Sequence, residues 1–406
     1  MNSKPSGAHS LVTQLLHDDT PSAPGFDAFP VAVARASTVV FPDLATMRDF
    51  RFEDDTQWRY GLHGTPTSRT LERRLAMIEG GKHALLQPSG LASISNVYFA
   101  FLRQGDDVLV PDNAYTPNRD HGDWLARDFG VSVRYYDPMI GAGIAALLQD
   151  NTRLVWVEAP GSVTMEVPDV PAIAAAAHAH GAGRERGVIV AIDNTYAAGL
   201  SFKPFEHGCD VSVQALTKYQ SGASDVLMGA TISNDAAIHG ALKRARMRLG
   251  LGVSADDCSL LLRSLATLEI RYAAHERTAL SLAAWLKLRP EIDCVLHPGL
   301  PDCAGHEHWR RDFTGAGGLF SVIFEPSYSA EQVDAFVEGL SLFKIGFSWG
   351  GAHSLAVPYR IGAMRTASEW PHSGQLVRFF IGLESEDDLR ADLEQSLSTH
   401  LVQSPA

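Results

Sequence analysis

The sequence predicts an α/β protein with a mainly parallel central sheet flanked by helices, followed by a smaller C-terminal α+β domain. Short strand-like segments alternate with helical patterns between residues 67 and 215, as they do in successive βαβ units. The segment 187–193 opens on apolar residues rich in Val and Ile, which is typical of a strand buried on both faces of a parallel sheet. Beyond residue 255 a long helical stretch precedes further strands, which indicates a change of architecture.

The first elements follow from periodicity and from residues that begin or end helices. From Thr67 onward apolar side chains recur on one helical face until Gly80-Gly81 ends the helix. A short strand at 84–86 leads into Pro88-Ser89-Gly90, where a second helix begins. The elements expected after these are strands at 107–111, 131–136, 154–158, 187–193 and 210–215, with helices at 119–129, 141–149 and 171–180.

The C-terminal region has a different pattern. Residues 258–289 predict a long helix, broken near Arg271 and stopped by Pro290. Strands are expected at 318–324 and 377–382. The expected division of the chain is an N-terminal arm over 1–60, a larger domain over 61–255 and a C-terminal domain over 256–406.

Composition excludes several classes of protein. The 406 residues carry a formal net charge of −13, which argues against nucleic acid or an anionic membrane as the main partner. No stretch approaches the roughly 18 consecutive apolar residues of a membrane span, and no secretory signal is recognised, so we expect a soluble cytoplasmic protein. The four cysteines are scattered, which predicts unpaired thiols. Cys303, His306 and His308 lack the second ligand pair of a metal site, so no metal is expected.

An acid and a lysine end two neighbouring predicted strands. Asp193 ends the strand 187–193, and Lys218 follows the strand 210–215. Because parallel strands present their carboxyl ends to one crevice, both side chains should open on the same site. A lysine whose pKa is lowered by burial can form a Schiff base, and pyridoxal phosphate enzymes combine such a lysine with an acid on the pyridinium nitrogen.

Further motifs occur in order around this pair. They are Tyr60-Gly61-Leu62-His63-Gly64-Thr65-Pro66-Thr67, Gln87-Pro88-Ser89-Gly90, Asn113-Ala114-Tyr115, Glu158-Ala159-Pro160-Gly161-Ser162, Ser348-Trp349-Gly350-Gly351 and Arg378. With Asp193 and Lys218 they resemble the Cys/Met-metabolism family of pyridoxal phosphate enzymes, and within it the β-lyases. The resemblance implies a fold type I enzyme that binds pyridoxal 5′-phosphate and a small amino-acid substrate. It also implies a homotetramer, a dimer of dimers with active sites shared between subunits.

Three segments are expected to bind the cofactor. Ser89, Gly90 and Leu91 lie where a strand meets a helix N-terminus, which favours phosphate binding; an ordinary Ser N-cap is the alternative. The resemblance adds the Thr217 hydroxyl as a phosphate ligand. It also implies that Tyr115 stacks on the pyridine ring.

Other residues are expected to bind the substrate. Arg378 lies within an apolar strand, where an arginine is rarely buried without a partner, and its planar fork suits a carboxylate. The resemblance assigns that carboxylate to the substrate, whereas Glu384 is the alternative partner. Ser348 and Trp349 form the segment in which tryptophan is typical of β-lyases, and Asp120 resembles a substrate-contacting acid.

The segment that is expected to cross between subunits departs from the family. The resemblance implies that Tyr60 reaches the neighbouring active site and that the arm, through the apolar run 38–41, lies over the neighbour. The family commonly has an arginine two residues after this tyrosine, but here the position is Leu62. The missing arginine removes one charge-assisted hydrogen bond. We expect His63 or another nearby cation to replace that bond in part.

The implied reaction is α,β-elimination of L-cystathionine to homocysteine, pyruvate and ammonia. Lys218 is the expected general base, Asp193 the partner of the ring nitrogen, and Tyr115 and Tyr60 position cofactor and substrate. Two alternatives remain open. One is γ-elimination or γ-replacement with the same residues, as in the family's γ-lyases and γ-synthases, and the other is a non-catalytic relative that binds the cofactor.

Overall fold

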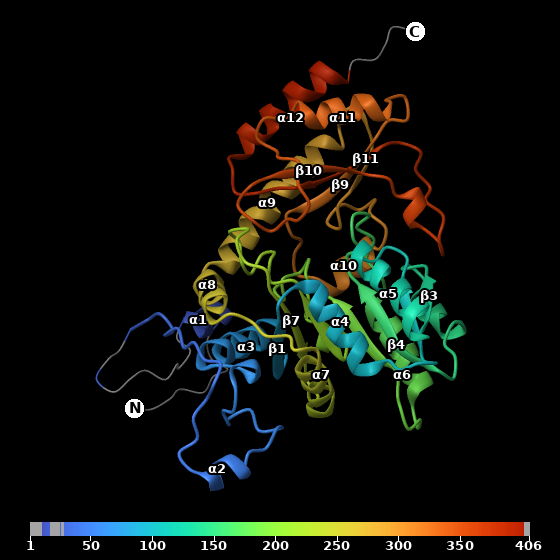
Figure 1. The fold of residues 1–406 in the computed structure, drawn as a ribbon. Helices are drawn as coiled ribbons and strands as arrows, with labels where there is room; N and C mark the ends of the chain where they lie inside the picture. Colours follow the sequence, from blue (N-terminus) through green and yellow to red (C-terminus); the bar gives the residue numbers. More distant parts are fainter. Residues whose placement is uncertain (1–9, 17–24, 26–27, 402–406) are drawn as a thin grey trace.

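The computed structural model describes residues 10–16, 25 and 28–401, and two β-sheets organise them (Figure 1). The larger sheet has seven strands in the order β1-β7-β6-β5-β4-β2-β3. Its strands are β1 (His83–Gln87), β2 (Asp107–Pro111), β3 (Ser132–Tyr136), β4 (Thr152–Glu158), β5 (Ile189–Asp193), β6 (Val211–Gln214) and β7 (Gly229–Ser233).

The pairing confirms the predicted class. Strands β3, β2, β4, β5 and β6 pair in parallel, while β7 runs antiparallel to both β6 and β1. Nearly all residues of β2, β4, β6 and β7 are buried, which explains the apolar runs of β2 and β4. Strand β7 was not predicted, because its Gly-Ala-Thr-Ile-Ser sequence lacks both a long apolar run and a clear alternation.

Helices cover this sheet and connect its strands (Figure 1). They are α3 (Pro66–Glu79), α4 (Gly90–Phe101), α5 (Thr116–Phe129), α6 (Val170–Gly181) and α7 (Ala236–Leu249), with short 3-10 turns η2 (Gly141–Ala146) and η3 (Pro204–His207). Thr65 and Ser68 form a capping box at the start of α3, and Gly80 ends it in the left-handed conformation (φ 74°). The helix predicted over 141–149 is wrong: Gly141 and Gly143 leave a single short 3-10 helix.

Two helices lead from this sheet to the C-terminal part. Helix α8 (Ala255–Leu265) packs on α3, and α9 (Leu268–Leu286) rises from it to the second sheet (Figure 1). The predicted break near Arg271 is misplaced, because the chain leaves the helical conformation at Thr267 (φ −115°, ψ 7°). Arg271 continues α9 and donates a hydrogen bond to the Tyr219 carbonyl.

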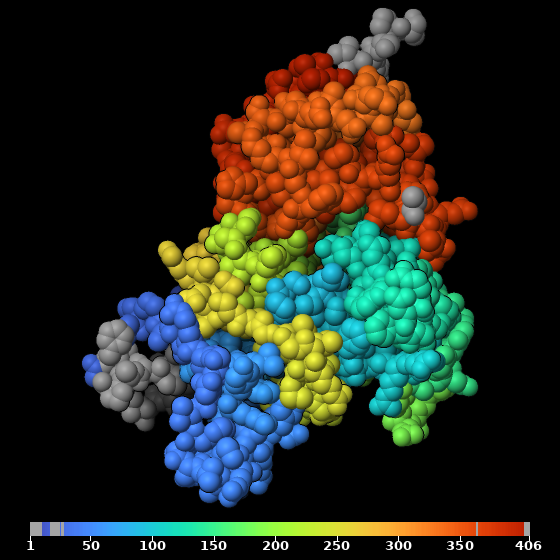
Figure 2. Space-filling model, viewed as in Figure 1, coloured from blue at the N-terminus to red at the C-terminus, as the bar shows by residue number. Residues whose placement is uncertain are grey.

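The second sheet is antiparallel, with the order β10-β11-β9-β8. Its strands are β8 (Ile292–Leu296), β9 (Leu319–Phe324), β10 (Leu355–Tyr359) and β11 (Leu376–Phe380), accompanied by α10 (His306–Asp312), α11 (Ala330–Glu338), η4 (Gly362–Met364) and α12 (Glu386–His400). Figure 2 shows these orange and red residues as one mass above the remaining chain. The predicted strands at 318–324 and 377–382 are confirmed as β9 and β11.

The N-terminal region contains short elements, α1 (Leu11–Leu16), α2 (Leu44–Arg48) and η1 (Gly61–His63). The proline-rich stretch at 20–24 lies outside the described residues. In the predicted docking run, Val40 is 87% exposed. The expected division at 60 and 255 stays a prediction; α8 begins at Ala255.

The described helices include none that is long and apolar enough to cross a membrane. All four cysteines are free thiols, as expected.

Candidate active site

One cavity of about 700 Å³ lies at the carboxyl ends of β4, β5 and β6, where parallel sheets bind their ligands. Strand β11 of the second sheet contributes to its wall. The predicted site residues that line it are Ser89, Gly90, Leu91, Tyr115, Asp193, Thr217, Lys218, Ser348, Trp349 and Arg378. Residues from six separate stretches of the sequence therefore meet in one place.

Lys218 follows β6 and points at the C-terminal part of the chain. Its backbone carbonyl accepts a hydrogen bond from Gly222 N (3.0 Å), which forms a turn beyond the strand. Its Nζ atom donates to Ser348 Oγ at 2.8 Å and lies 5.1 Å from the ring centroid of Trp349. Burial lowers the pKa of Lys218 to about 8, and repulsion by Arg378 adds to the effect. The amine can therefore act as a nucleophile or a base near neutral pH.

Asp193 is the last residue of β5 and lies next to Glu158 of β4 and Val213 of β6 in the parallel register. Its Oδ1 accepts a hydrogen bond from Thr195 N at 3.0 Å. Burial raises the pKa of Asp193, whereas Thr195 and the attraction of Lys218 oppose the rise. A cationic nitrogen brought into the cavity would stabilise this carboxylate in its charged form.

The N-terminus of α4 forms the opposite part of the cavity. Ser89 is an N-cap whose side chain accepts a hydrogen bond from Ala92 N at 3.1 Å. A Cβ on Gly90 would lie 2.7 Å from the Ala215 Cβ, so this position requires glycine. Ser89 is thus an N-cap, the alternative that its sequence position left open. This role is compatible with phosphate binding, because the helix N-terminus itself lines the cavity.

Arg378 extends from β11 into the cavity and is only 6% exposed. Its guanidinium lies 5.0 Å from the Tyr359 ring centroid and makes one long hydrogen bond, 3.4 Å, to the Ser348 carbonyl. Within residues 28–401 no carboxylate forms an ion pair with it. The alternative partner, Glu384, accepts hydrogen bonds from Ser354 N and Oγ instead, each at 2.8 Å. A buried, unpaired arginine at a cavity wall is suited to binding a carboxylate.

Tyr115 begins α5, and its backbone N–H donates to Glu158 Oε2 at 2.8 Å. The side chain is 42% exposed and lines the cavity.

Three further residues that line the cavity, Glu158, Thr195 and Tyr359, were given no role from the sequence. Glu158 had a detectable signal, since it ends a predicted strand beside that of Asp193. Tyr359 had none, because strand β10 was not predicted.

The cavity fits pyridoxal 5′-phosphate. It combines a helix N-terminus for phosphate, a lysine with a lowered pKa and an acid at a strand end, and its unpaired arginine leaves a place for the carboxylate of an amino-acid substrate. Asp193 provides the carboxylate partner for a pyridinium nitrogen, and Glu158 lies beside it.

Three predicted site residues lie away from the cavity. Asp120 is exposed on α5, Tyr60 is 48% exposed, and His63 lies in the turn η1. Burial and nearby cations, Arg59 among them, lower the pKa of His63, so this residue is poorly suited to carry a positive charge. The expectation that Tyr60 serves a neighbouring subunit stays a prediction.

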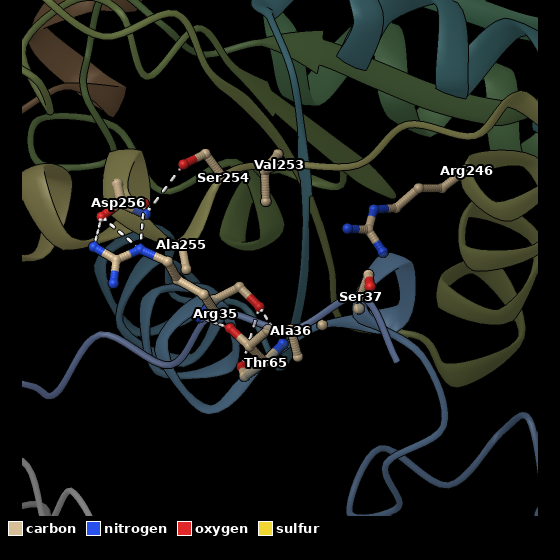
Figure 3. Close-up of a pocket in the computed structure, with 12 residues that line it drawn as sticks. Arg35, Ala36, Ser37, Thr65, Arg246, Val253, Ser254, Ala255 and Asp256 are labelled. Carbon is tan, nitrogen blue, oxygen red and sulfur yellow. Dashed lines mark hydrogen bonds and ion pairs between the residues drawn. The ribbon is translucent and has the colours of Figure 1, made fainter. Parts of the chain in front are cut away.

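A second cavity of about 410 Å³ lies beside the turn that carries Leu62 (Figure 3). Arg35 extends to Asp256 and pairs with it through two nitrogens, with one contact at 2.8 Å. Arg246 is buried and donates to the carbonyls of Leu62 (3.0 Å) and Leu86 (2.7 Å). Arg246 thus holds the turn, whereas Arg35 pairs with α8, and the wall of this cavity contains no lysine.

The described residues show one cluster with metal-binding geometry, Asp55, His83 and His239. Asp55 already pairs with Lys243 (2.6 Å) and Arg69 (2.8 Å), and two cations on its carboxylate disfavour a metal ion.

Cys303, His306 and His308 each bond to a backbone carbonyl. The expectation that they bind no metal stays a prediction.

Comparison with known proteins agrees with this geometry. A model of the family described as Cys/Met metabolism PLP-dependent enzyme matches residues 12–398. A putative cystathionine β-lyase of Rhizobium johnstonii is 42% identical, with 90% of each chain covered. The cystathionine β-lyase MetC of Escherichia coli K12 is 39% identical, with 95% of this chain and 97% of the relative covered.

A solved structure supports the same assignment. The cystathionine gamma synthase of Xanthomonas oryzae pv. oryzae superposes with a TM-score of 0.86 at 29% identity, covering 96% of this chain and 98% of that one. The predicted fold type is thereby confirmed, and the cofactor of the family is pyridoxal 5′-phosphate. The chain belongs to the Cys/Met metabolism family of pyridoxal phosphate-dependent enzymes.

Proposed function

We propose that the protein catalyses the α,β-elimination of L-cystathionine to homocysteine, pyruvate and ammonia. The observation that carries the proposal is the meeting of Lys218, whose pKa is lowered to about 8, with the unpaired Arg378 in one cavity. The names of the relatives from Rhizobium johnstonii and Escherichia coli support the choice of reaction.

The chain's own residues have distinct roles in this proposal. Arg378 binds the α-carboxylate of the substrate through its planar guanidinium, which orients the Cα–H bond toward Lys218. Lys218 removes the Cα proton and returns a proton to the sulfur as the Cβ–S bond breaks. When bound, the cofactor supplies the electron sink for the negative charge at Cα.

Asp193 and Tyr115 set the position and charge state of the cofactor. The Asp193 carboxylate, which is fixed by Thr195, would hold the proton on the ring nitrogen of the bound cofactor. Tyr115 would stack on the ring. Ser89, Gly90, Leu91 and Thr217 bind the phosphate at the start of α4.

Ser348 and Trp349 form the side of the cavity next to Lys218. The tryptophan favours β-elimination. The alternative is one of the γ-reactions, which also require proton transfer at Cβ. Asp120 and Tyr60 are retained as substrate-binding candidates that do not line the cavity of their own chain. The proposal also includes a homotetramer with shared sites and a cytoplasmic location.

The absence of an arginine at position 62 bears on the shared site. Arg246 binds the Leu62 carbonyl directly, so it is the second cation, besides His63, that could support the turn in place of the usual arginine. Because the pKa of His63 is lowered, Arg246 is the stronger candidate.

Product analysis tests the proposed reaction. Purified protein loaded with pyridoxal 5′-phosphate is incubated with L-cystathionine, and pyruvate and 2-oxobutyrate are quantified separately. Accumulation of pyruvate with an equal amount of homocysteine supports the proposal. Formation of 2-oxobutyrate alone would assign a γ-lyase reaction, and absence of both products would support a non-catalytic relative.

A further inference from the structure

Glu158 is a buried acid in the cavity wall that has no part in the catalytic steps proposed above. It is the last residue of β4 and only 8% exposed, and it lies beside Asp193 in the parallel register. Neighbouring residues in a parallel pair present their side chains to the same face of the sheet. Two carboxyl groups thus lie side by side in one buried place.

The surrounding residues stabilise the charged form of Asp193 more than that of Glu158. Asp193 is attracted by Lys218 and accepts a hydrogen bond from Thr195 N, so it is the better-stabilised carboxylate. Glu158 accepts the N–H of Tyr115 at 2.8 Å, and the backbone of Ser162 also favours its charged form, but Glu158 forms no ion pair with any of residues 28–401. Burial and the charge of Asp193 both disfavour an ionised Glu158.

The other ionisable groups nearby do not change this conclusion. The groups that share the cavity wall or act on Glu158 are Asp193 on β5, Tyr196 after β5, Tyr115 at the start of α5, Tyr98 on α4, Lys218 after β6, Tyr359 on β10 and Arg378 on β11. Lys218 is engaged by Ser348, and Arg378 contacts the Ser348 carbonyl and the Tyr359 ring. Tyr98 donates its hydroxyl to Asn118 at 2.6 Å. No cation in this set pairs with Glu158.

We propose that Glu158 is a proton-bearing positioning residue, which fixes the start of α5 and thereby the ring of Tyr115 while remaining neutral. A neutral Glu158 leaves a single negative charge, on Asp193, to match a single positive charge on the cofactor ring. Two carboxylates would place an excess negative charge next to that ring in a buried cavity. The inference rests on the proposed function only in that the cofactor occupies this cavity.

Two variants separate the proton from the hydrogen bond. Glu158→Gln keeps an oxygen that accepts the Tyr115 N–H and is as neutral as the proposed acid. Glu158→Leu removes the acceptor and leaves the N–H unpaired. For each holoenzyme, the dissociation constant of pyridoxal 5′-phosphate and the pH midpoint of the cofactor's visible absorption band are measured.

The two variants should differ in their dissociation constants for the cofactor. Glu158→Gln should keep the dissociation constant within about twofold and the midpoint within about 0.3 units, because no charge is removed. Glu158→Leu should raise the dissociation constant about tenfold through the unpaired N–H group. A midpoint shift of about one unit or more in Glu158→Gln would show that a charged carboxylate had been lost, and would overturn the proposal.

Infrared spectroscopy provides a second measurement that does not depend on the leucine variant. Wild-type protein should show a protonated carboxyl C=O stretch that is missing from Glu158→Gln, and carboxyl-labelled glutamate assigns the band. Identical spectra would contradict a neutral Glu158. Both results are independent of the reaction product, so a failure of the elimination assay and a failure of this inference are separate outcomes.

Discussion

The Nζ atom of Lys218 lies 2.8 Å from Oγ of Ser348, so a lysine positioned by the central sheet is held by a residue of the chain segment that precedes β10. Ser348 has a φ of 104°, in the region that disfavours side chains. The backbone of this residue is therefore held in an unfavourable conformation at the point where it contacts the lysine. The C-terminal part thus contributes directly to the environment of Lys218.

Substitution of Ser348 separates its hydroxyl from its backbone. Ser348→Ala and Ser348→Gly both remove the hydrogen bond to Lys218, and kcat/KM should fall by about tenfold in each. Glycine tolerates a positive φ, so Ser348→Gly should have a free energy of unfolding about 1 kcal/mol higher than Ser348→Ala. Steady-state kinetics and denaturant titration measure the two effects. Equal stability of the two variants would show that the backbone is not strained.

Arg378 should be needed for activity but not for folding. Arg378→Gln removes the proposed carboxylate ligand, so kcat/KM should fall about 100-fold or more, mainly through KM. Because the arginine is a buried charge without an acidic partner, thermal stability in the absence of substrate should stay the same or rise. Arg378→Lys is the control that keeps the charge but loses the bidentate geometry. A large loss of stability in Arg378→Gln would point to a structural role instead.

The pKa of Lys218 predicts how the apoprotein captures its cofactor. Only the neutral amine is a nucleophile, so the rate of pyridoxal 5′-phosphate incorporation should rise with pH through a midpoint near 8. Arg378 contributes to the lowered pKa, so Arg378→Gln should move the midpoint upward, whereas Arg378→Lys should move it less. Stopped-flow absorbance measures the rate. A wild-type midpoint near the ordinary lysine value of 10.5 would contradict the buried environment described above.

Asp112 connects the cofactor-binding sheet to the loop between β10 and β11. It accepts N–H groups of Thr366 (2.8 Å), Ala367 (3.0 Å) and Ser368 (2.9 Å) and pairs with Arg119 at 2.9 Å. Asp112→Asn places an amide donor among these donors, so the free energy of unfolding should fall by about 2 kcal/mol. Asp128→Asn, in an exposed pair with Arg127, is the control that should have little effect.

The same residue predicts a pH dependence of stability. The N–H groups and Arg119 lower the pKa of Asp112 to about 2 from its ordinary 3.8. A lowered pKa stabilises the fold above the unfolded value, and this contribution disappears as the pH falls through the folded value. The stability difference between wild type and Asp112→Asn should therefore be full above about pH 4 and shrink toward pH 2. A difference that is constant over this range would exclude Asp112 as a charged clamp.

Much of the fold could be predicted because buried parallel strands leave a simple signal. The strands that end at Asp193 and Glu158 were both predicted from short apolar runs. The structure ends the two strands at these same residues. Arg378 stood out as a charge inside an apolar strand. Strand β10 was missed because Pro358 interrupts its pattern, and Tyr359 was missed with it.

Other features depend on contacts that no local pattern reports. The break between α8 and α9 occurs without Pro or Gly, so periodicity alone misplaced it at Arg271. The role of Glu158 depends on Asp193, its neighbour on the adjacent strand. Arg378 has no acidic partner because Glu384 accepts hydrogen bonds from Ser354 instead. Tyr60 and His63 were grouped with the site through resemblance, and their distance from this cavity could not be derived from the sequence.

Lys218 is the residue that we propose holds the cofactor and moves the proton. Borohydride reduction of the holoenzyme, followed by digestion and mass spectrometry of the peptides, tests this role directly. One cofactor mass is expected, on the peptide that contains Lys218. Lys203 is the informative competitor, because it is also largely buried but donates to the carbonyls of Ile78 and Gly199. The cofactor mass on Lys203, or on any lysine other than Lys218, would contradict the account.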